Sequence, residues 1–596
     1  MKRLAIITCF LVTISVSHAQ RYEWIKTLHG ASSVGLSHMI TDEDGCIYVD
    51  GGARLDLMYD TVVIRPLLSS QGYIETLKYV AKILPNGEFA WNKLLYGHNY
   101  YFPSFSPSIY NTKLIGDTAL LLDAQIRFPT RPRYMLLDSL FLIDTLLFSI
   151  DTGFLPPHFF DSVERNQIIG LPMILSSVDG HLQEYHTMEI AFVDNHGHLR
   201  SIYSFDSVGQ DTTSLYFDAA QWSDLEMDCG GNFVGVAIQH HYLYKNGVRG
   251  MCYMVDNERR GEIPQNSNHD RGNRLLVKFS PHFDSLLAYQ WLFDSVGKSF
   301  KCDLQCIKTD SQGNIYTTWL LDVPTASLPM HLTFVGNRDL EMDVTHNTEG
   351  VLVKFSPDLV PLWFKHLRSD WPEVDNPRMS LQGIAIDEDS NAVFVAGNAR
   401  NFTHTVPVVI DSTVFETSHS RFVFRFDLDD GRLVSYGKVD YPDSTYTFGP
   451  RAIWPQIAAS KGRVFFELMF QEGFSYGDTT FFVPDTNSQS YGEGVVVMDY
   501  QGRLLDFIDF RRTVWPEHGN GSRFLAQHDS VLTLGFYYGS GEYSWFGDTC
   551  VMANDDIGVI ARYVDPAYAI PYGHQPVAVP YIPLQSSDML AVWPNP

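Results

Sequence analysis

An apolar run, a short polar turn and a second apolar run recur along this chain of 596 residues. The clearest copy covers 350–364 and reads Gly-Val-Leu-Val-Lys-Phe-Ser-Pro-Asp-Leu-Val-Pro-Leu-Trp-Phe. Val and Phe residues on both sides of a Ser-Pro-Asp turn predict a β-hairpin. Seven copies align on one column of the first strand, whose members are Lys82, Phe192, Lys278, Lys354, Arg425, Val497 and Arg562.

Each hairpin follows an earlier pair of apolar segments that an acidic or Gly-containing turn connects. Clear copies of this pair lie at 39–49, 307–316 and 384–395, and looser copies lie around 228–232 and 460–462. In between, Asp-Thr or Asp-Ser precedes apolar residues at Asp60, Asp411, Asp478 and Asp548. About four strands per repeat, at a period of tens of residues, predict an all-β fold and a seven-bladed β-propeller. Strands that are apolar on consecutive residues indicate burial on both faces, which a blade between two neighbours requires.

The two ends of the repeat array complement each other. Residues 22–28 resemble the last strand of a repeat that has no earlier part, whereas the chain after 566 lacks such a strand. We therefore predict that 22–28 pairs with the strand near 558–564 and closes the ring, since closure removes exposed sheet edges. The expected blades lie near 31–100, 101–208, 213–296, 299–370, 371–443, 444–514, and 515–566 together with 20–30.

Other segments are expected outside the regular blades. Two repeats carry extra sequence, at 128–187 and 240–273, which we assign to loops because excess length in a regular array lies there. Several prolines make 567–591 an extended linker.

The N-terminus and the charge define the compartment. Lys2 and Arg3 precede an apolar stretch at 4–15 and a Ser-His-Ala cleavage site, so 1–19 reads as a signal peptide for Sec export. No later stretch is long enough for a spanning helix, and we expect a monomer without a transmembrane anchor in the mature chain. The net charge of −26 argues against nucleic acid or an anionic membrane as the main partner. The six cysteines after 19 are scattered singly, and we interpret most of them as small buried apolar residues.

The repeat resembles the secreted bacterial β-propeller repeats of the SBBP type. Those repeats combine an apolar strand, Asp-x-x-Gly-Asn-x-Tyr, Asp-Thr, Val-x-Lys-Phe and Trp. Here 310–316 reads Asp-Ser-Gln-Gly-Asn-Ile-Tyr, 353–355 reads Val-Lys-Phe, and Trp363 follows. The resemblance covers roughly 20–566, and the copies near 101–208 and 444–514 depart from it. It implies a secreted propeller.

The last five residues, 592–596, read Val-Trp-Pro-Asn-Pro. They resemble the opening of the type A C-terminal sorting domain of the type IX secretion system, which usually reads Val-Tyr-Pro-Asn-Pro. This resemblance implies a Bacteroidota-type protein that meets the type IX secretion machinery and reaches the cell surface or the medium. It also leads us to expect that 567–596 packs little against the propeller and that the natural gene continues into a small β-domain.

The basic members of the hairpin column form the most prominent constellation of charged residues. Lys82, Lys278, Lys354, Arg425 and Arg562 would lie at equivalent places on five blades. One interpretation is a basic ring that recognises an anionic ligand such as an acidic glycan. The other is a structural pair between each basic group and an acidic turn of the same or the next blade. Repetition from blade to blade favours the structural pair, because repeat units retain what packs them together.

Other chemistry-bearing motifs are incomplete. Asp387, Asp389 and Asn391, and likewise Asp42 and Asp44, place oxygen ligands at alternate positions as Ca²⁺ requires, but a bidentate Glu is missing and the same residues make ordinary turns. Asp151-Thr152-Gly153 matches the short aspartic-protease signature without a second copy. His196 with His198, and His240 with His241, lack the further ligands of a metal site. No cofactor is expected, and Ca²⁺ is the one metal considered.

Three functions remain open at this stage. The first is a non-enzymatic binding scaffold, secreted or on the cell surface, for an extracellular protein or glycan. The second is a propeller hydrolase or lyase acting on carbohydrate, and the third is a structural envelope component. The fold alone does not decide among them. Two or three carboxylates converging with His or Arg in the central channel would favour the enzyme.

Overall fold

The computed structural model is all-β, as the apolar pattern predicts. Among the residues that the structure describes, the only helical segment is a 3₁₀ turn at Thr325–Ser327. The described residues are 22–30, 34–42, 44–53, 57–59, 62–64, 77–96, 108–115, 119–128, 168–170, 185–194, 199–207, 220–239, 251–255, 258–263, 275–281, 285–294, 300–369, 378–400, 405–441, 457–470, 473–482, 492–511, 523–528, 531–538, 543–546, 549–552, 557–564 and 592–594.

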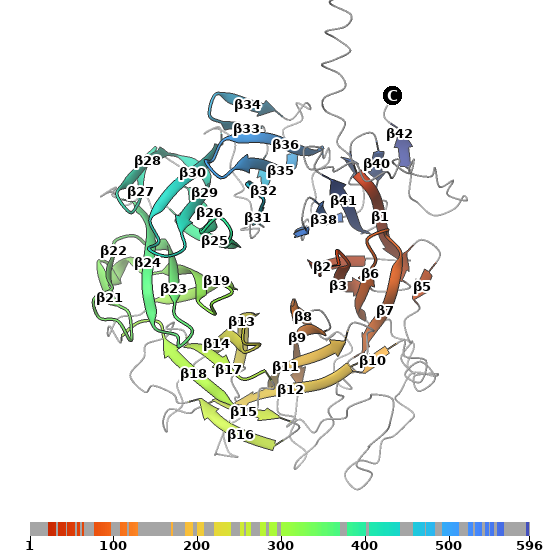
Figure 1. Cartoon of the computed structure of the whole chain (residues 1–596), viewed down its shortest axis with the longest axis horizontal. Helices are drawn as coiled ribbons and strands as arrows, with labels where there is room; N and C mark the ends of the chain where they lie inside the picture. The colour runs from red at the N-terminus through yellow and green to blue at the C-terminus, as the bar shows by residue number, and fades with distance from the viewer. Residues whose placement is uncertain are drawn as a thin grey trace, which may run out of the picture.

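Most of the described strands form antiparallel four-stranded meanders, which follow one another around a ring (Figure 1). Outside them, β10 (Ile168–Gly170) pairs parallel with the strand at 89–96. The first three are β2 (Val34–Thr41), β3 (Ile47–Ala53), β6 (Leu77–Ile83) and β7 (Phe89–Tyr96); β8 (Ser108–Ile115), β9 (Ala119–Phe128), β11 (Tyr185–Asp194) and β12 (Leu199–Ser207); and β13 (Ala220–Met227), β14 (Phe233–Gln239), β17 (Leu275–Phe279) and β18 (Leu286–Trp291). The fourth and fifth are β19 (Lys301–Thr309), β20 (Ile315–Asp322), β23 (Thr348–Phe355) and β24 (Pro361–Ser369); and β25 (Arg378–Asp387), β26 (Ala392–Arg400), β29 (His419–Asp427) and β30 (Leu433–Asp440). The sixth is β31 (Ile457–Ser460), β32 (Arg463–Phe470), β35 (Gly492–Asp499) and β36 (Leu504–Arg511).

The seventh meander combines both ends of the chain. It consists of β37 (Arg523–His528), β38 (Val531–Tyr538), β41 (Ile557–Val564) and, as its fourth strand, β1 (Tyr22–Gly30). β1 pairs antiparallel with β41 in a register that places Tyr22 opposite Tyr563 and Leu28 opposite Gly558. In each meander the first strand, here called the inner strand, faces the middle of the ring, and the fourth strand, here called the rim strand, lies outside (Figure 1).

Hairpins between the second and third strands reach back to the preceding meander, and we call them straps. β4 (Leu57–Tyr59) and β5 (Val62–Ile64) extend the sheet at β1, and β15 (Met251–Val255) and β16 (Glu258–Ile263) extend it at β12. β27 (Val406–Ile410) with β28 (Thr413–Thr417) joins β24, and β33 (Gly473–Tyr476) with β34 (Thr479–Phe482) joins β30. The dipeptides at Asp411 and Asp478 thus form turns of additional hairpins that cover rim strands.

Aromatic pairs fix three straps to their own meanders; one of the three is the hairpin of β21 (Met330–Thr333) and β22 (Glu341–Val344), next to which Phe334 bridges to Phe293. Phe334 packs on Phe364 at 5.0 Å between ring centroids, Phe415 on Tyr436 at 4.6 Å, and Phe481 on Phe507 at 5.1 Å. The first member of each pair lies in or next to a strap, and the second lies in the rim strand of the meander that carries that strap. A strap therefore joins two meanders, one through backbone pairing and the other through aromatic contact.

The apolar core lies between neighbouring meanders. One buried cluster joins the third and fourth, and others join the fourth to the fifth, the fifth to the sixth and the sixth to the seventh. The third strands are buried on both faces; seven of the eight residues of β23 are buried and the remaining one is half-buried. Cys46 and Cys302 are buried as expected, whereas Cys229 is exposed.

The last described strand corrects the expectation for the tail. β42 (Val592–Pro594) pairs antiparallel with β40 (Thr549–Met552), the second strand of the hairpin that begins with β39 (Tyr543–Phe546). Residues 592–594 therefore add a third strand to this hairpin, which lies between β38 and β41 in the chain. The predicted linker at 567–591 lies outside the described residues. No helix in the described part of the chain has the length and apolarity to cross a membrane.

Candidate functional site

The turns between inner and second strands share one geometry in the third and fourth meanders. In the third meander, Asp228 Oδ1 accepts hydrogen bonds from the backbone N–H groups of Gly230 and Asn232, both at 2.9 Å. Gly231 has φ of +77°, a conformation that glycine adopts without steric cost. Asp310 in the fourth meander makes the same contacts to Gln312 and Asn314 at 3.0 and 2.8 Å. The short Asp side chain replaces backbone partners, which is the physical reason for Asp in this turn.

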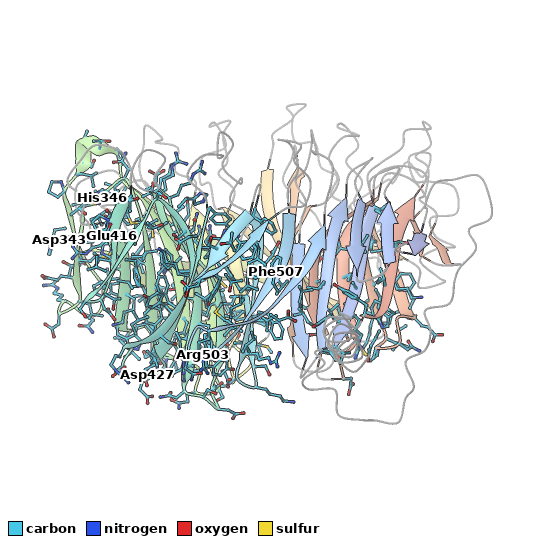
Figure 2. All side chains as sticks on the ribbon, turned by 90° about the horizontal axis from the view of Figure 1, so that it is seen from above. Asp343, His346, Glu416, Asp427, Arg503 and Phe507 are labelled. Atoms are coloured by element: carbon cyan, nitrogen blue, oxygen red, sulfur yellow. The ribbon has the colours of Figure 1, made fainter. Side chains whose placement is uncertain are left out.

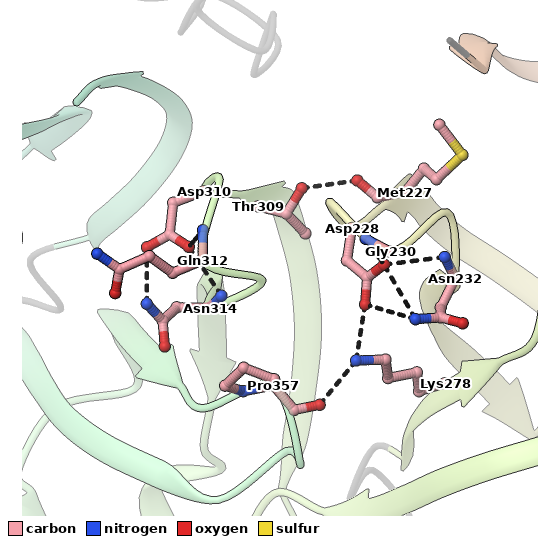
Figure 3. A network of polar contacts seen from close by, with 10 residues as sticks. All are labelled: Met227, Asp228, Gly230, Asn232, Lys278, Thr309, Asp310, Gln312, Asn314 and Pro357. Atoms are coloured by element: carbon pink, nitrogen blue, oxygen red, sulfur yellow. Dashed lines mark hydrogen bonds and ion pairs between the residues drawn. The ribbon is translucent and has the colours of Figure 1, made fainter. Parts of the chain in front are cut away.

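Lys278 joins this turn to the next meander. Its Nζ lies 2.7 Å from Asp228 Oδ2 and donates to the backbone carbonyl of Pro357 at 2.9 Å (Figure 3). Burial alone would raise the pKa of Asp228, but hydrogen bonds from Lys278 and Asn232 outweigh burial and hold that pKa below its ordinary value. A buried ammonium thus has one charged and one neutral partner, as burial of a charge requires.

The same contact recurs around the ring, and we call it the clamp. Lys354 Nζ donates to the carbonyl of Leu428 at 2.6 Å, and Arg425 Nη1 donates to that of Tyr500 at 3.4 Å. Arg562 Nη1 donates to the carbonyl of Pro85 at 2.9 Å, which joins the seventh meander to the first. The acceptors Pro85, Pro357, Leu428 and Tyr500 each follow the column residue of their own meander by three positions. A clamp therefore always connects one meander to the hairpin turn of the next.

A tyrosine completes the turn in several meanders. Tyr48 and Tyr316 lie under the ammonium groups of Lys82 and Lys354, at 4.8 and 5.2 Å from the ring centroids. Tyr316 also donates its hydroxyl to Asp310 of its own turn. The fifth meander has Phe394 at this position, and Tyr500 of the sixth meander makes both the hydroxyl contact and the ring contact in its place. Its hydroxyl donates to Asp387 and its ring lies 5.4 Å below the Arg425 guanidinium. Tyr500 therefore ties the turn of one meander to the hairpin of the next.

The structure thus places four of the five basic residues in contact with a neighbouring meander, namely Lys278, Lys354, Arg425 and Arg562. Lys278 and Lys354 are buried, and Lys82 lies 3.2 Å from Asp42 in its own meander. Arg425 and Arg562 have protein partners as well, with Arg562 Nε 2.7 Å from Glu23. Lys82 and Lys278 form the pairs with an acidic turn that the second interpretation describes. Lys354 and Arg425 donate to backbone carbonyls instead, and Arg562 pairs with Glu23 in β1. Recognition of an anionic ligand by the same groups stays a prediction.

The proposed Ca²⁺ ligands surround one turn of the fifth meander. Asp387 accepts from Tyr500, Asp389 is exposed, and Asn391 has φ of +46° and donates to Asp427 and Asp429. Across the described residues, no three His, Cys, Asp or Glu side chains are arranged to hold a metal ion. Binding of Ca²⁺ by these residues stays a prediction. The protease-like triplet at 151–153 and the two histidine pairs lie outside the described residues.

Polar side chains on two neighbouring inner strands, β13 and β19, contact the neighbouring strand. Glu226 on β13 forms an ion pair with Lys308 on β19, with 2.9 Å between Oε2 and Nζ. Thr309 Oγ1 donates to the carbonyl of Met227 across the same boundary at 2.7 Å. These polar groups join two meanders to each other.

Sequence reasoning missed a buried carboxylate, that of Glu349, which lies towards the face of the ring opposite to the acidic turns. Figure 2 labels His346 towards one face and Asp427 and Arg503 at the other. Glu349, three residues after His346, has a fully buried side chain that accepts from the backbone N–H groups of Thr345 and His346 at 3.1 and 2.9 Å. His366 Nε2 on the rim strand lies 2.5 Å from its Oε2. A Glu beside the otherwise apolar run 350–353 was the available signal.

Loss of one clamp should weaken the ring measurably. Lys354→Met keeps most of the aliphatic stem but leaves the Leu428 carbonyl without its donor, so we expect a loss of about 1–3 kcal/mol in unfolding free energy. Lys301→Met in the same meander is the control, since Lys301 is exposed. Urea unfolding of both variants measures the difference. Equal stability of the two variants would show that the clamp does not hold the meanders together.

Comparisons with known proteins give distant structural likeness only. No family model matches the sequence, and no curated protein matches it. A quinohemoprotein alcohol dehydrogenase from Pseudomonas putida is similar at TM-score 0.30 and 8% identity, over 90% of this chain and 77% of the other. A leech intramolecular trans-sialidase is similar at 0.26 and 10%, over 85% and 65% of the two chains. A virginiamycin B lyase from Staphylococcus aureus is similar at 0.20 and 7%, over 65% and 92%.

Proposed function

We propose that the protein is a secreted or cell-surface binding scaffold without enzymatic activity, built as a seven-bladed β-propeller that its N-terminal strand closes. The meanders would be the blades, and β1 would be the last strand of the last blade. The pairing of β1 with β41 supports this closure. The clamp from Arg562 to Pro85 also supports closure, because it joins the seventh meander to the first by the same contact that joins consecutive meanders elsewhere.

The main observation behind the proposal is the position of the buried charged side chains in the described residues. Lys278, Lys354 and Asp228 are buried and satisfied within or between neighbouring meanders, and Glu349 is satisfied within its own. An enzyme site instead gathers titratable groups with perturbed pKa values around an open cleft. Charge used to connect blades supports a rigid ring that presents its loops to a partner.

A paired assay tests the proposal. The purified mature protein would be applied to a glycan array and to a panel of immobilised extracellular proteins, beside a broad carbohydrate hydrolase and lyase screen. We expect saturable binding of one class without turnover, and loss of that binding in an unfolded sample. Turnover of any substrate that the Glu226→Gln variant abolishes would instead favour the propeller enzyme with a channel carboxylate.

We also propose export through Sec and then across the outer membrane. The predicted signal peptide at 1–19 and the resemblance of 592–596 to the opening of a sorting domain support this route. In a host with type IX secretion, the full-length protein is expected at the surface or in the medium, and deletion of everything after Asp565 should retain it in the periplasm. Secretion of the deleted form would remove the basis for a sorting signal in the tail.

A further inference from the structure

The clamp is absent by residue type from two boundaries of the ring, here called joints. The column residue of the second meander is Phe192 and that of the sixth is Val497, and neither side chain has a hydrogen-bond donor. The clamps at the third–fourth, fourth–fifth, fifth–sixth and seventh–first joints use Lys278, Lys354, Arg425 and Arg562. The two joints at Phe192 and Val497 divide the ring into an arc of meanders three to six and an arc of meanders seven, one and two. At the first–second joint the column residue is Lys82, and position 195, where its acceptor would lie, is outside the described residues.

The packing of the inner strands follows the same division. β8 and β13 at the second–third joint, and β31 and β37 at the sixth–seventh joint, pack together less extensively than the inner strands of the other joints. Val497 lies in the apolar cluster between the sixth and seventh meanders. Apolar contact is non-directional, whereas a hydrogen bond from a buried ammonium fixes distance and direction. Packed elements without such a bond can slide or separate in small steps.

The straps distinguish the two unclamped joints from each other. At the second–third joint, β15 pairs with β12 over five residues, from Tyr203 opposite Val255 to Ser207 opposite Met251. At the sixth–seventh joint, β39 and β40 lie beside β36, but within the described residues no backbone pairing connects them to it. The outer edge is thus tied by backbone pairing at one joint, whereas in the described part of the chain the other joint has packing of β39 on β36 but neither a clamp nor a strap pairing.

We infer that the ring is a two-arc device that opens at the sixth–seventh joint and turns about the strap at the second–third joint. Opening would separate β31 from β37 and expose the inner edges of both strands. The strap pairing at β12 and β15 keeps the two arcs together while the joint on the other side is open. Opening at this joint would not depend on whether the protein is a scaffold or an enzyme.

Repeat symmetry supplies matched label sites for the test. The rim strands carry a β-bulge at the same position in successive meanders, occupied by Ala90, Leu362 and Leu505. All three side chains are exposed. Non-natural spin-labelled amino acids at 90 and 505 span the sixth–seventh and seventh–first joints, and labels at 362 and 505 span two clamped joints. The native cysteines stay in place.

Pulsed electron resonance on the full mature chain then measures both distance distributions. We expect a broad or two-component distribution for 90–505, roughly twice as wide as a single narrow one for 362–505. Lys354→Met should broaden the 362–505 distribution, because it removes a clamp between those labels. Hydrogen exchange gives an independent readout, with β31 and β37 expected to exchange about tenfold faster than β19 and β25. Equal widths for the two label pairs, or equal exchange in these strands, would overturn the inference.

Discussion

Glu349→Gln is expected to lower the unfolding free energy by about 3 kcal/mol at pH 5, because it leaves donors from three residues around a buried group without their carboxylate. Burial alone would raise the pKa of Glu349, but hydrogen bonds from His346 and His366 outweigh burial and lower the pKa to about 2. An unfolded Glu has a pKa of about 4.3. Because the folded pKa is the lower one, this stabilisation is complete above about pH 4.3 and disappears as the pH falls towards 2.

The expected signature is therefore a pH-dependent difference between two proteins. In denaturant unfolding from pH 6 to 2.5, the unfolding free energy of the wild type should approach that of the Glu349→Gln variant as the pH falls. Asp343→Asn is the matched control, since Asp343 also contacts a histidine, His331 at 2.9 Å, but its side chain is 69% exposed. Exposed pairs contribute little, so this control should change stability only slightly. A Glu349→Gln deficit that stays constant down to pH 2.5 would contradict the assignment.

Gly502→Ala is expected to be the most disruptive change of a single methyl group at a joint. Gly502 has φ of +77°, and a Cβ atom there would overlap the backbone carbonyl of Tyr436 in the preceding meander. Backbone cannot move aside as a flexible side chain can, so the fifth and sixth meanders would have to separate. We expect a loss of about 4 kcal/mol, made up of left-handed backbone strain and the forced shift.

Gly462→Ala separates these two contributions. Gly462 belongs to the same meander and has φ of +82°, but nothing lies within 4 Å of the position that its Cβ would take. Strain alone should cost about 1–2 kcal/mol. Thermal or urea unfolding of the two variants side by side measures the difference. If Gly462→Ala is as damaging as Gly502→Ala, close approach between the meanders is not the cause.

Much of the architecture could be predicted from the repeat pattern, because the residues that specify each strand and turn are close together in the sequence. Runs such as Val351-Leu352-Val353 require burial on both sides, and Asp310 with Gly313 specifies its turn through contacts within five residues. The absence of a final strand near 566 and the unmatched strand at 22–28 together indicated where the ends meet. All-β structure and the pairing of β1 with β41 follow from patterns of this kind.

The straps escaped sequence reasoning because their partners are distant. Asp411 and Asp478 showed that a turn was present, but nothing local shows that β27 pairs with β24 or that β33 pairs with β30. These rim strands lie in the preceding repeat. The pairing of Val592–Pro594 was missed for the same reason, since its partner hairpin lies more than forty residues earlier.

By itself, the sequence determined the strand content, the repeat length, the turn chemistry and the column of basic residues. Only the tertiary structure decided what that column contacts, because Lys278 and Pro357 are 79 residues apart and meet only when two meanders pack. It also decided that Tyr500 serves the fifth meander, where Phe394 lacks a hydroxyl. Side-chain type and short spacing are encoded locally, whereas the partner of a buried charge is set by which surfaces come together to exclude water.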